Sequence, residues 1–323
     1  MNRILIVRPS SLGDIVHALP IVHDLHRHRP GVEIDWVVEE PFTDLVGMTR
    51  GVRRVIAIAL RRWRRGALAR STWGEMRAFR RELAHERYDA VIDLQEQVKG
   101  ALIAWFARGP VHGPDRASVR EPAATLFYRH RYRINPQQHL IDRCRQLAGM
   151  ALGYAPAGPP HVELRTPGLR DPPPGPYAVF VHATSRPDKL WPEADWRGLL
   201  EHLSGRQLSV VLPWGTPAEA ARSERLAAGS SNAIVPGRLE LPELAALLAR
   251  AAVVVGVDTG LTHLAAALSA PTIALFVATD SRLAGVARLG THARDLGSVS
   301  HVPALAEVVA AINLLQGRRA VAR

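Results

Sequence analysis

The chain has 323 residues, 47% of them hydrophobic, which is enough for two domains with packed cores. Its 25 glycines and 24 prolines follow no fixed period and no heptad repeat is present, so collagen, coiled coil and a disordered chain are excluded. The 41 Lys and Arg residues outnumber the 30 Asp and Glu residues and give a net charge of +11. This charge favours anionic partners, namely nucleic acid, an anionic membrane face or phosphorylated substrates.

The cysteine count and the apolar runs bear on location. Cys144 is the only cysteine, which excludes an internal disulfide and a cysteine-type zinc site and favours the cytosol. The amino end has an apolar run of only four residues before Arg8, so we expect no signal peptide. The longest apolar stretches, such as 102–107, are far shorter than the ~20 residues that span a bilayer. The sequence predicts a soluble or peripheral protein.

The amino-terminal half alternates strand and helix patterns. Strands are expected where apolar, β-branched runs are flanked by charged or turn residues, at 4–7, 33–38, 52–59 and 88–94. Helical periodicity is expected at 14–28 and 71–86. Strands separated by helices imply parallel βαβ units.

A proline-rich stretch divides the chain. Residues 156–176 have little periodicity and predict a linker between a first domain, 1–155, and a second, 177–323. The strand pattern then restarts at 177–182, 208–213, 233–235, 252–257 and 272–277, with a helix at 241–250. We expect two doubly wound α/β domains, with the last helix a candidate to pack back on the first. Ligands of such folds bind outside the carboxyl ends of the strands.

The loop after the first strand carries polar groups at the start of a helix. Ser10, Ser11, Gly13 and Asp14 lie where backbone N–H groups of the helix point at a ligand. Asp14 as a simple N-cap remains the alternative. No G-x-G-x-x-G or G-x-x-x-x-G-K-[ST] motif is present, so this is neither the dinucleotide fingerprint nor a P-loop.

A second loop of this kind spans 258–263, between a buried strand and a helix rich in Leu and Ala. A pyrophosphate would fit there, with N–H groups of Thr259 and Gly260 as donors and His263 one turn further on. Asp258 as a helix cap is the alternative. An aspartic protease is excluded, because its dyad needs two such carboxylates and this sequence has a single Asp-Thr-Gly.

The third polar loop, 182–192, contains Thr184, Ser185 and Lys189. A lysine there can neutralise a leaving phosphate, and the alternative is a solvated loop lysine. Four arginines surround one tryptophan at 61–65, which indicates an anion-binding surface or a solvated face. We predict no metal site, because the histidines of the helix 14–28 have no carboxylate partner pattern.

Eight segments, in this order along the chain, together resemble the lipopolysaccharide heptosyltransferase I family of glycosyltransferase family nine. They are Ser10–Asp14 with His17 and Leu19-Pro20, Trp36–Glu40, Arg61–Arg64, Arg120–Pro122, His182–Thr184, Lys189–Pro192, Pro213–Gly215 and Asp258–His263. The resemblance runs from the first strand to at least Pro271. The segment 94–100, with Glu96, Gln97 and Gly100, departs from the family pattern.

This resemblance implies a GT-B fold of two Rossmann-like domains that face a central cleft, with the acceptor on the first domain and the nucleotide sugar on the second. It implies transfer of L-glycero-D-manno-heptose from ADP-heptose to a Kdo residue of Kdo-lipid A, with inversion and without a metal ion. ADP-heptose is then a substrate, and no cofactor is expected. Closure of the two domains would exclude water that otherwise hydrolyses the donor.

The resemblance also implies residue roles. Asp14 is the expected general base and Lys189 the contact to the donor phosphate. The remaining donor-binding residues are expected to be Thr184, Ser185, Glu219, Asp258, Thr259, Gly260 and His263. The acceptor-binding residues are expected to be Ser10, Ser11, Gly13, Arg61, Arg62, Arg64 and Arg120.

Two competing interpretations remain at this point. A transferase that adds the second heptose, or another nucleotide-sugar enzyme of the same fold, would share the loops at Asp14 and Asp258 but should lack the arginine cluster. A nucleic-acid-binding protein would use the basic stretch on phosphates but has no use for three phosphate-type loops. We therefore expect no nucleic-acid partner, and we expect a cytoplasmic enzyme held at the anionic inner face of the membrane.

Overall fold

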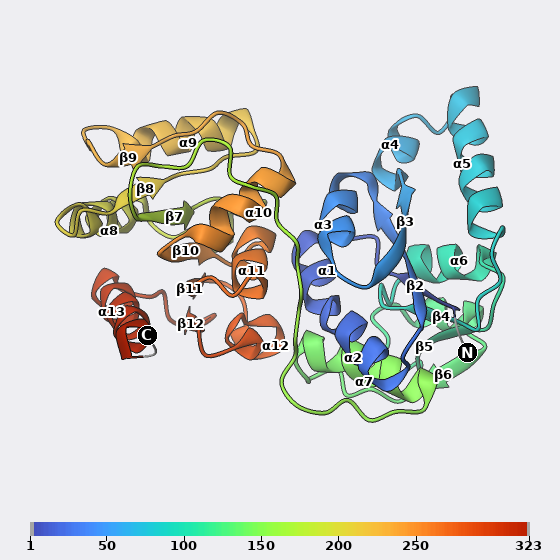
Figure 1. The fold of residues 1–323 in the computed structure, drawn as a ribbon. Coiled ribbons are helices and arrows are strands. Elements are labelled where there is room, and N and C mark those ends of the chain that lie inside the picture. Colours follow the sequence, from blue (N-terminus) through green and yellow to red (C-terminus); the bar gives the residue numbers. More distant parts are fainter. Residues whose placement is uncertain (1–2, 322–323) are drawn as a thin grey trace. The chain divides into compact units, whose positions relative to one another are not determined.

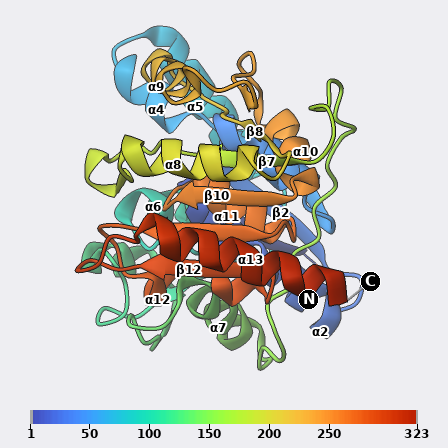
Figure 2. The same ribbon diagram turned by 90° about the vertical axis from the view of Figure 1, so that its left-hand side faces the viewer.

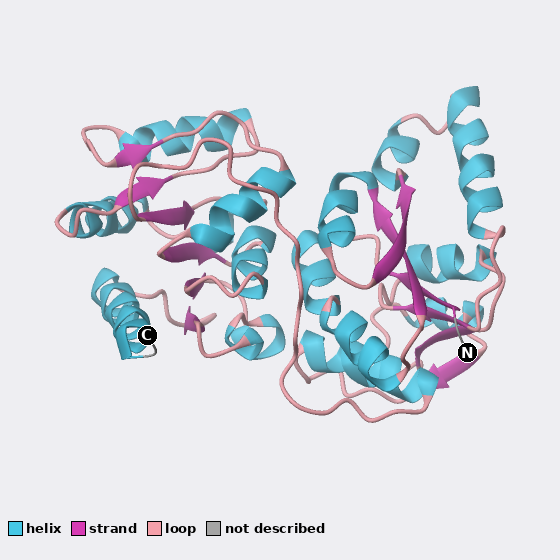
Figure 3. Cartoon of the chain, in the orientation of Figure 1, coloured by secondary structure: helices cyan, strands magenta, loops and turns pink. Residues whose placement is uncertain are grey.

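The computed structural model describes the backbone of residues 3–321 and the side chains of residues 3–315. The chain forms two compact units, residues 1–163 and 164–323. Both alternate strands and helices along the chain (Figure 3). Within the described residues, no helix is long and apolar enough to cross a membrane.

The first unit is built on a six-stranded parallel sheet with the order β3-β2-β1-β4-β5-β6 (Figure 1). Its strands are β1 (Arg3–Val7), β2 (Glu33–Glu39), β3 (Val52–Ile58), β4 (Ala90–Asp93), β5 (Val111–Pro114) and β6 (His130–Tyr132). Its helices are α1 (Leu12–Ala18), α2 (Pro20–His28), α3 (Thr43–Met48), α4 (Leu60–Arg65), α5 (Arg70–Leu83), α6 (Val98–Phe106) and α7 (Leu140–Leu152). Two 3₁₀ turns, η1 (Glu40–Phe42) and η2 (Pro122–Phe127), lie between them.

The second unit repeats this plan with the order β12-β11-β10-β7-β8-β9. Its strands are β7 (Tyr177–Val181), β8 (Ser209–Val211), β9 (Ala233–Ile234), β10 (Val253–Val257), β11 (Thr272–Phe276) and β12 (Ala293–Gly297). Its helices are α8 (Glu193–Ser204), α9 (Pro217–Ala227), α10 (Leu241–Arg250), α11 (Gly260–Ala267), α12 (Ser281–Ala284) and α13 (Leu305–Val321), with 3₁₀ turns η3 (Pro187–Lys189) and η4 (Ala287–Leu289).

In each unit the strands follow the doubly wound order 3-2-1-4-5-6, counted from that unit's first strand. The order reverses between β1 and β4 in the first unit and between β7 and β10 in the second. Apart from Arg3 at the start of β1 and the buried Asp93 at the end of β4, these central strands are apolar, because helices cover both sides of the sheet. The predicted fold of two Rossmann-like doubly wound domains is confirmed.

Some elements differ from the sequence expectations. The helix expected at 14–28 is two helices, because Pro20 begins α2 and ends the hydrogen bonding of α1. Strands β5, β6 and β12 were not anticipated. Their sequences, VHGP, HRY and ARDLG, contain few β-branched residues and no regular alternation, so they form strands only because a neighbouring edge is available.

The proline-rich stretch is partly tied to the first unit. The buried guanidinium of Arg145 pairs with Asp24 at 2.7 Å and also donates to the carbonyl groups of Ala157 and Gly158. Further along, the N–H of Arg50 donates to the carbonyl of Glu163 at 2.9 Å. The boundary between the two compact units therefore falls within the predicted linker 156–176, after residue 163.

The last helix belongs to the second unit. Figure 2 shows α13 running beside α8 across that unit. Val308, Ala311, Ile312 and Leu315 on α13 are buried in the same apolar core as Trp191 and Trp196. These four side chains are therefore used within the helix's own unit. The expectation that the helix packs back on the first domain stays a prediction.

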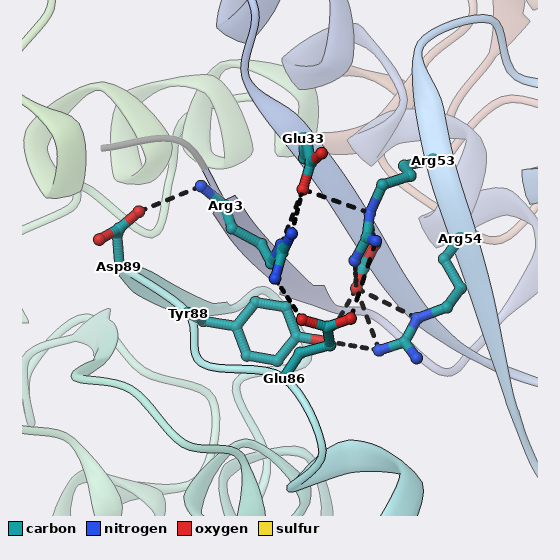
Figure 4. Close-up of polar contacts among 8 residues, drawn as sticks. Arg3, Glu33, Arg53, Arg54, Glu86, Tyr88 and Asp89 are labelled. Carbon is teal, nitrogen blue, oxygen red and sulfur yellow. Dashed lines mark hydrogen bonds and ion pairs between the residues drawn. The ribbon is translucent and has the colours of Figure 1, made fainter.

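Part of the arginine excess is consumed by ion pairs at the amino ends of the first unit's strands (Figure 4). Arg3 binds Glu33, with 2.7 Å between Nε and Oε2, and also binds Glu86. Arg53 and Arg54 both contact the fully buried carboxylate of Asp35, at 2.6 and 3.1 Å. These arginines stabilise the sheet edge and are not available to a ligand.

Candidate active site

The loop between β1 and α1 places Asp14 at the carboxyl edge of the first sheet. Ser11 is the N-cap of α1, and Oδ2 of Asp14 accepts its N–H at 3.0 Å and its hydroxyl at 2.9 Å. Asp14 is therefore not the N-cap residue itself, which was the alternative interpretation. It contributes to capping from the third helical position, where it completes a capping box with Ser11. About a third of its side chain remains exposed (32%), so the carboxylate is still accessible.

Arg8 holds the other carboxylate oxygen of Asp14. This arginine is only 5% exposed, and its Nη2 lies 3.1 Å from Oδ1 of Asp14 while Nη1 donates to the carbonyl of Leu94. Burial acts to raise the pKa of Asp14, but the charge of Arg8, the Ser11 hydrogen bonds and the charge of Arg120 outweigh it and lower this pKa. Asp14 is therefore ionised at neutral pH.

The loop after β4 meets the Asp14 loop at the point where the strand order reverses. Oε1 of Gln95 accepts the N–H of Ser10 at 3.2 Å, and Nζ of Lys99 lies 3.5 Å from the Ser10 hydroxyl. A Cβ on Gly100 would lie 2.4 Å from Cβ of Gln95, so the helix start needs glycine there. The segment that departs from the family pattern thus forms one wall of the Asp14 site.

Three residues around Asp14 were not identified from the sequence: Arg8, and Gln95 and Lys99 from the segment after β4. The available signal was the expected strand at 88–94, because a loop after a parallel strand can meet the loop after its neighbour. Which strand is the neighbour of β1 depends on the sheet order, which the sequence does not give directly.

The predicted acceptor arginines divide into two groups. Arg62 is held by carboxylates, at 2.8 Å from Glu40 and 2.6 Å from Glu75. Arg61 and Arg64 are exposed, and the guanidinium of Arg61 lies 5.7 Å from the centre of the Phe42 ring. Of the α4 arginines expected to bind an acceptor, Arg61 and Arg64 have no ion pair among the described residues, whereas Arg62, which is also exposed, is paired with two carboxylates. The acceptor role of Arg62 stays a prediction.

Electrostatic effects connect these arginines to the Asp14 site. Burial raises the pKa of Glu39 at the end of β2, while the charges of Arg61 and Lys99 act to lower it. Arg120 is exposed and contributes to the lowered pKa of Asp14. The structure therefore brings Arg61, Arg120 and the Ser10–Asp14 loop to the same edge of the first sheet.

In the second unit, Asp258 follows β10 and receives donors from three side chains. Oδ2 accepts from Nζ of Lys189 at 2.6 Å and from the hydroxyl of Thr279 at 2.7 Å, and Oδ1 lies 3.1 Å from Nε2 of His263. Burial acts to raise the pKa of Asp258, but His263, Lys189 and Thr279 together lower it well below its usual range. The carboxylate binds side chains here, which replaces the predicted alternative of a helix cap.

The start of α11 is held tightly against β10. Thr259 is its N-cap residue, and Thr262 donates to the carbonyl of Val257 at 2.7 Å. A Cβ on Gly256 would lie 2.2 Å from Oγ1 of Thr262, so glycine is required for this close approach. The first N–H groups of a helix have no intrahelical acceptor, and those of Gly260 and Leu261 are consequently suited to bind an anion.

The remaining predicted donor residues lie at the carboxyl edge of the same sheet. Thr184 and Ser185 follow β7, the neighbour of β10, and lead into the turn that carries Lys189. Glu219 follows β8 and accepts the N–H groups of Gly215 and Thr216 at 2.8 and 3.1 Å. One oxygen of Glu219 thus caps α9. Among the residues that the structure describes, no three His, Cys, Asp or Glu side chains lie close enough together to hold a metal ion.

Comparisons with known proteins agree on one family. A model of Glycosyltransferase family 9 (heptosyltransferase) matches residues 76–308. Lipopolysaccharide heptosyltransferase 1 of Pseudomonas aeruginosa is 46% identical over 286 residues, 88% of this chain and 81% of the relative. The protein of the same name from Salmonella typhimurium is 44% identical over 287 residues, 88% of this chain and 90% of the relative.

Solved structures give the same result. E. coli heptosyltransferase WaaC with ADP has a TM-score of 0.90 and 39% identity, covering 97% of this chain and 99% of that chain. E. coli ADP-heptose lps heptosyltransferase II, at 20% identity over 99% of both chains and a TM-score of 0.79, shares the fold. The chain therefore belongs to glycosyltransferase family 9, the heptosyltransferases, and has their GT-B fold.

Proposed function

We propose that this glycosyltransferase moves L-glycero-D-manno-heptose from ADP-heptose to a Kdo residue of Kdo-lipid A in the synthesis of the lipopolysaccharide inner core. The observation that carries the proposal is the pair of polar sites at the two reversal points, a partly exposed carboxylate in the first unit and a lysine with a helix start in the second. The relatives named lipopolysaccharide heptosyltransferase 1, at 44–46% identity, support the acceptor and the heptose.

The second unit is suited to the donor. Lys189 offers a positive charge to a diphosphate, and the start of α11 offers backbone N–H groups that have no acceptor within the helix. Arg186 in the same loop as Lys189 is paired with Asp188. As the bond between the anomeric carbon and phosphate oxygen breaks, Lys189 stabilises the charge that develops on ADP. A related E. coli structure, at 38% identity and a TM-score of 0.83, was determined with ADP-2-deoxy-2-fluoro heptose.

Asp14 is the proposed general base. Its lowered pKa keeps it ionised, so it can accept the proton of the acceptor hydroxyl as that oxygen bonds to the anomeric carbon. One displacement, with ADP leaving on the opposite face, inverts the anomeric centre. This step needs neither a cofactor nor a metal ion to take up a proton or electrons, because the proton goes to Asp14 and the bonding electrons leave with ADP.

The acceptor and the location follow from charge. Kdo carries a carboxylate and lipid A carries phosphates, and planar guanidinium groups bind both well. Arg61, Arg64 and Arg120 are the exposed cations proposed to bind this acceptor. Because lipid A is anchored in a membrane, we place the enzyme at the cytoplasmic face of the inner membrane as a peripheral protein.

The test is incubation of the protein with ADP-heptose and Kdo-lipid A, followed by the mass of the lipid product. The expected product is heavier by one heptose and is formed equally well in EDTA. An acceptor that already carries one heptose is the matched control. Transfer only to that second acceptor would show that the enzyme adds the second heptose, and a requirement for divalent metal would refute the metal-free mechanism.

A further inference from the structure

The first unit has a surface rich in exposed apolar side chains on three neighbouring elements. On α5, Trp73 and Met76 are 53% and 40% exposed, and their spacing places them on the same side of the helix as Arg80. On α6, Trp105 is 58% exposed, and on η2, Leu126 is 78% exposed. Large apolar groups exposed together on a soluble unit mark an interaction site.

Ring contacts join these elements into one surface. The guanidinium of Arg80 lies 5.1 Å from the centre of the Phe106 ring, which links α5 to α6, and Figure 1 shows α5 ending beside α6. Trp105 contacts Phe106 and Phe127, with ring centres 5.6 and 6.2 Å apart, which links α6 to η2. We call this surface, from Trp73 through Trp105 to Leu126, the α5–α6 face.

Beside this face lies a hollow of about 890 Å³, lined by three exposed arginines, Arg87, Arg108 and Arg129, together with Trp105 and Leu126. The arginines lie shortly before the starts of β4, β5 and β6, whereas the Asp14 loop follows β1. Because all these strands are parallel, the hollow lies at the sheet edge opposite to Asp14. It is therefore separate from the proposed acceptor residues.

The hollow keeps an excess of positive charge. Its one acidic lining residue, Asp89, accepts the backbone N–H of Arg3 at 3.1 Å, and nearby Glu86 is bound by the Arg3 guanidinium (Figure 4). In the described part of the chain, the guanidinium groups of Arg87, Arg108 and Arg129 have no ion pair. Three arginines with no ion pair among the described residues, next to tryptophan and leucine, match the boundary between phosphates and acyl chains.

We propose that the α5–α6 face docks on a bilayer that contains anionic phospholipids. Trp105 and Leu126 enter the interface, and Arg87, Arg108 and Arg129 bind lipid phosphates in the hollow. This proposal names the surface by which a peripheral enzyme would be held at the membrane. It rests on the proposed function in one respect, namely that the acceptor is a lipid. Docking here holds the enzyme on the membrane that contains its acceptor and leaves Arg61, Arg64 and Arg120 unoccupied.

The test measures, by sedimentation, how tightly the protein binds phosphatidylcholine vesicles with and without phosphatidylglycerol. The vesicles contain no Kdo-lipid A acceptor. We expect the wild type to prefer anionic vesicles. The triple variant R87Q/R108Q/R129Q should bind them on the order of 100-fold more weakly, from about fivefold for each charge near an anionic surface. Its matched control, R27Q/R165Q/R170Q, removes the same charge from exposed sites elsewhere and should bind nearly as the wild type does.

A second pair of variants tests the apolar contribution. W105S/L126S should bind roughly tenfold or more weakly, and this loss should persist at high salt because burial of apolar surface is not screened. The loss caused by the arginine variant should instead shrink as salt rises. V299S/L314S, which removes exposed apolar groups of the second unit, is the control.

Activity separates this proposal from the proposed function. On a water-soluble Kdo acceptor without acyl chains, all four variants should transfer heptose as the wild type does. Absence of transfer by the wild type would refute the proposed function, while the vesicle result would still stand. The proposed docking surface would be refuted if R87Q/R108Q/R129Q and W105S/L126S bound vesicles as tightly as the wild type does. Equal binding of the wild type to neutral and anionic vesicles would also refute it, as would binding of inorganic phosphate in place of vesicles or self-association of the protein through this surface.

Discussion

In both units a polar site lies where the strand order of the sheet reverses, and the two sites are built alike but differ in how far their carboxylates are exposed. In each, a loop after the unit's first strand meets a loop after its fourth, and a cation pairs with a carboxylate: Arg8 with Asp14, and Lys189 with Asp258. Asp14 keeps 32% of its side chain exposed, whereas Asp258 keeps 12% and is surrounded by Lys189, Thr279 and His263. An accessible carboxylate suits proton transfer, and an enclosed one suits positioning of the lysine.

The largest expected effect comes from removing the accessible carboxylate. D14N should lower turnover by on the order of 10² to 10⁴, the usual size for loss of a general base, while affinity for ADP stays unchanged. Turnover with Kdo-lipid A and calorimetric titration with ADP measure the two quantities. Turnover close to that of the wild type would leave Asp14 with only its capping role.

Removing the cation of the second site should affect the donor. K189A should lower turnover about 10²-fold and also raise the KM for ADP-heptose, because the charge acts on bound diphosphate and on departing ADP. Steady-state kinetics at varied donor concentration give both numbers. Rescue by magnesium would contradict the role of Lys189, since a metal ion would then be able to replace it.

The exposed arginines allow a comparison within one helix. R61Q/R64Q should raise the acceptor KM by about tenfold for each charge-assisted contact of ~1.4 kcal/mol, leave ADP affinity unchanged and hardly move the melting temperature. R62Q removes the partner of Glu40 and Glu75 and should lower the melting temperature slightly, because these ion pairs are about half exposed to solvent. If R62Q alone raised the acceptor KM, the division of these arginines would be reversed.

The smallest effect concerns pH. Because Arg8 lowers the pKa of Asp14, its replacement in R8M should raise that pKa, and the acid limb of the kcat/KM profile should move to higher pH. R8K keeps the charge and should leave the limb closer to its wild-type position. An unmoved limb in R8M would show that another group sets the acid limb.

The strand pattern and the three polar loops could be predicted, because apolar runs and helix-start residues are local in sequence. Arg8 and Lys99 could not, since their roles depend on β4 lying next to β1. Nor could the sequence tell which arginines are free. Arg62 meets Glu75 through the turn between α4 and α5, and Arg53 meets Asp35 across neighbouring strands, contacts that only the folded chain creates.

The contacts of Arg145 decide where the chain can be divided. A recombinant fragment ending at residue 155 would remove the carbonyl groups of Ala157 and Gly158 from a guanidinium that is only 3% exposed. A buried cation that loses acceptors is destabilising, and the ion pair with Asp24 would then be its remaining charge partner. A first fragment carried through Glu163 keeps these acceptors and the backbone bond to Arg50. For anyone producing the first unit alone, the useful cut lies within the proline-rich stretch, several residues beyond the end of α7.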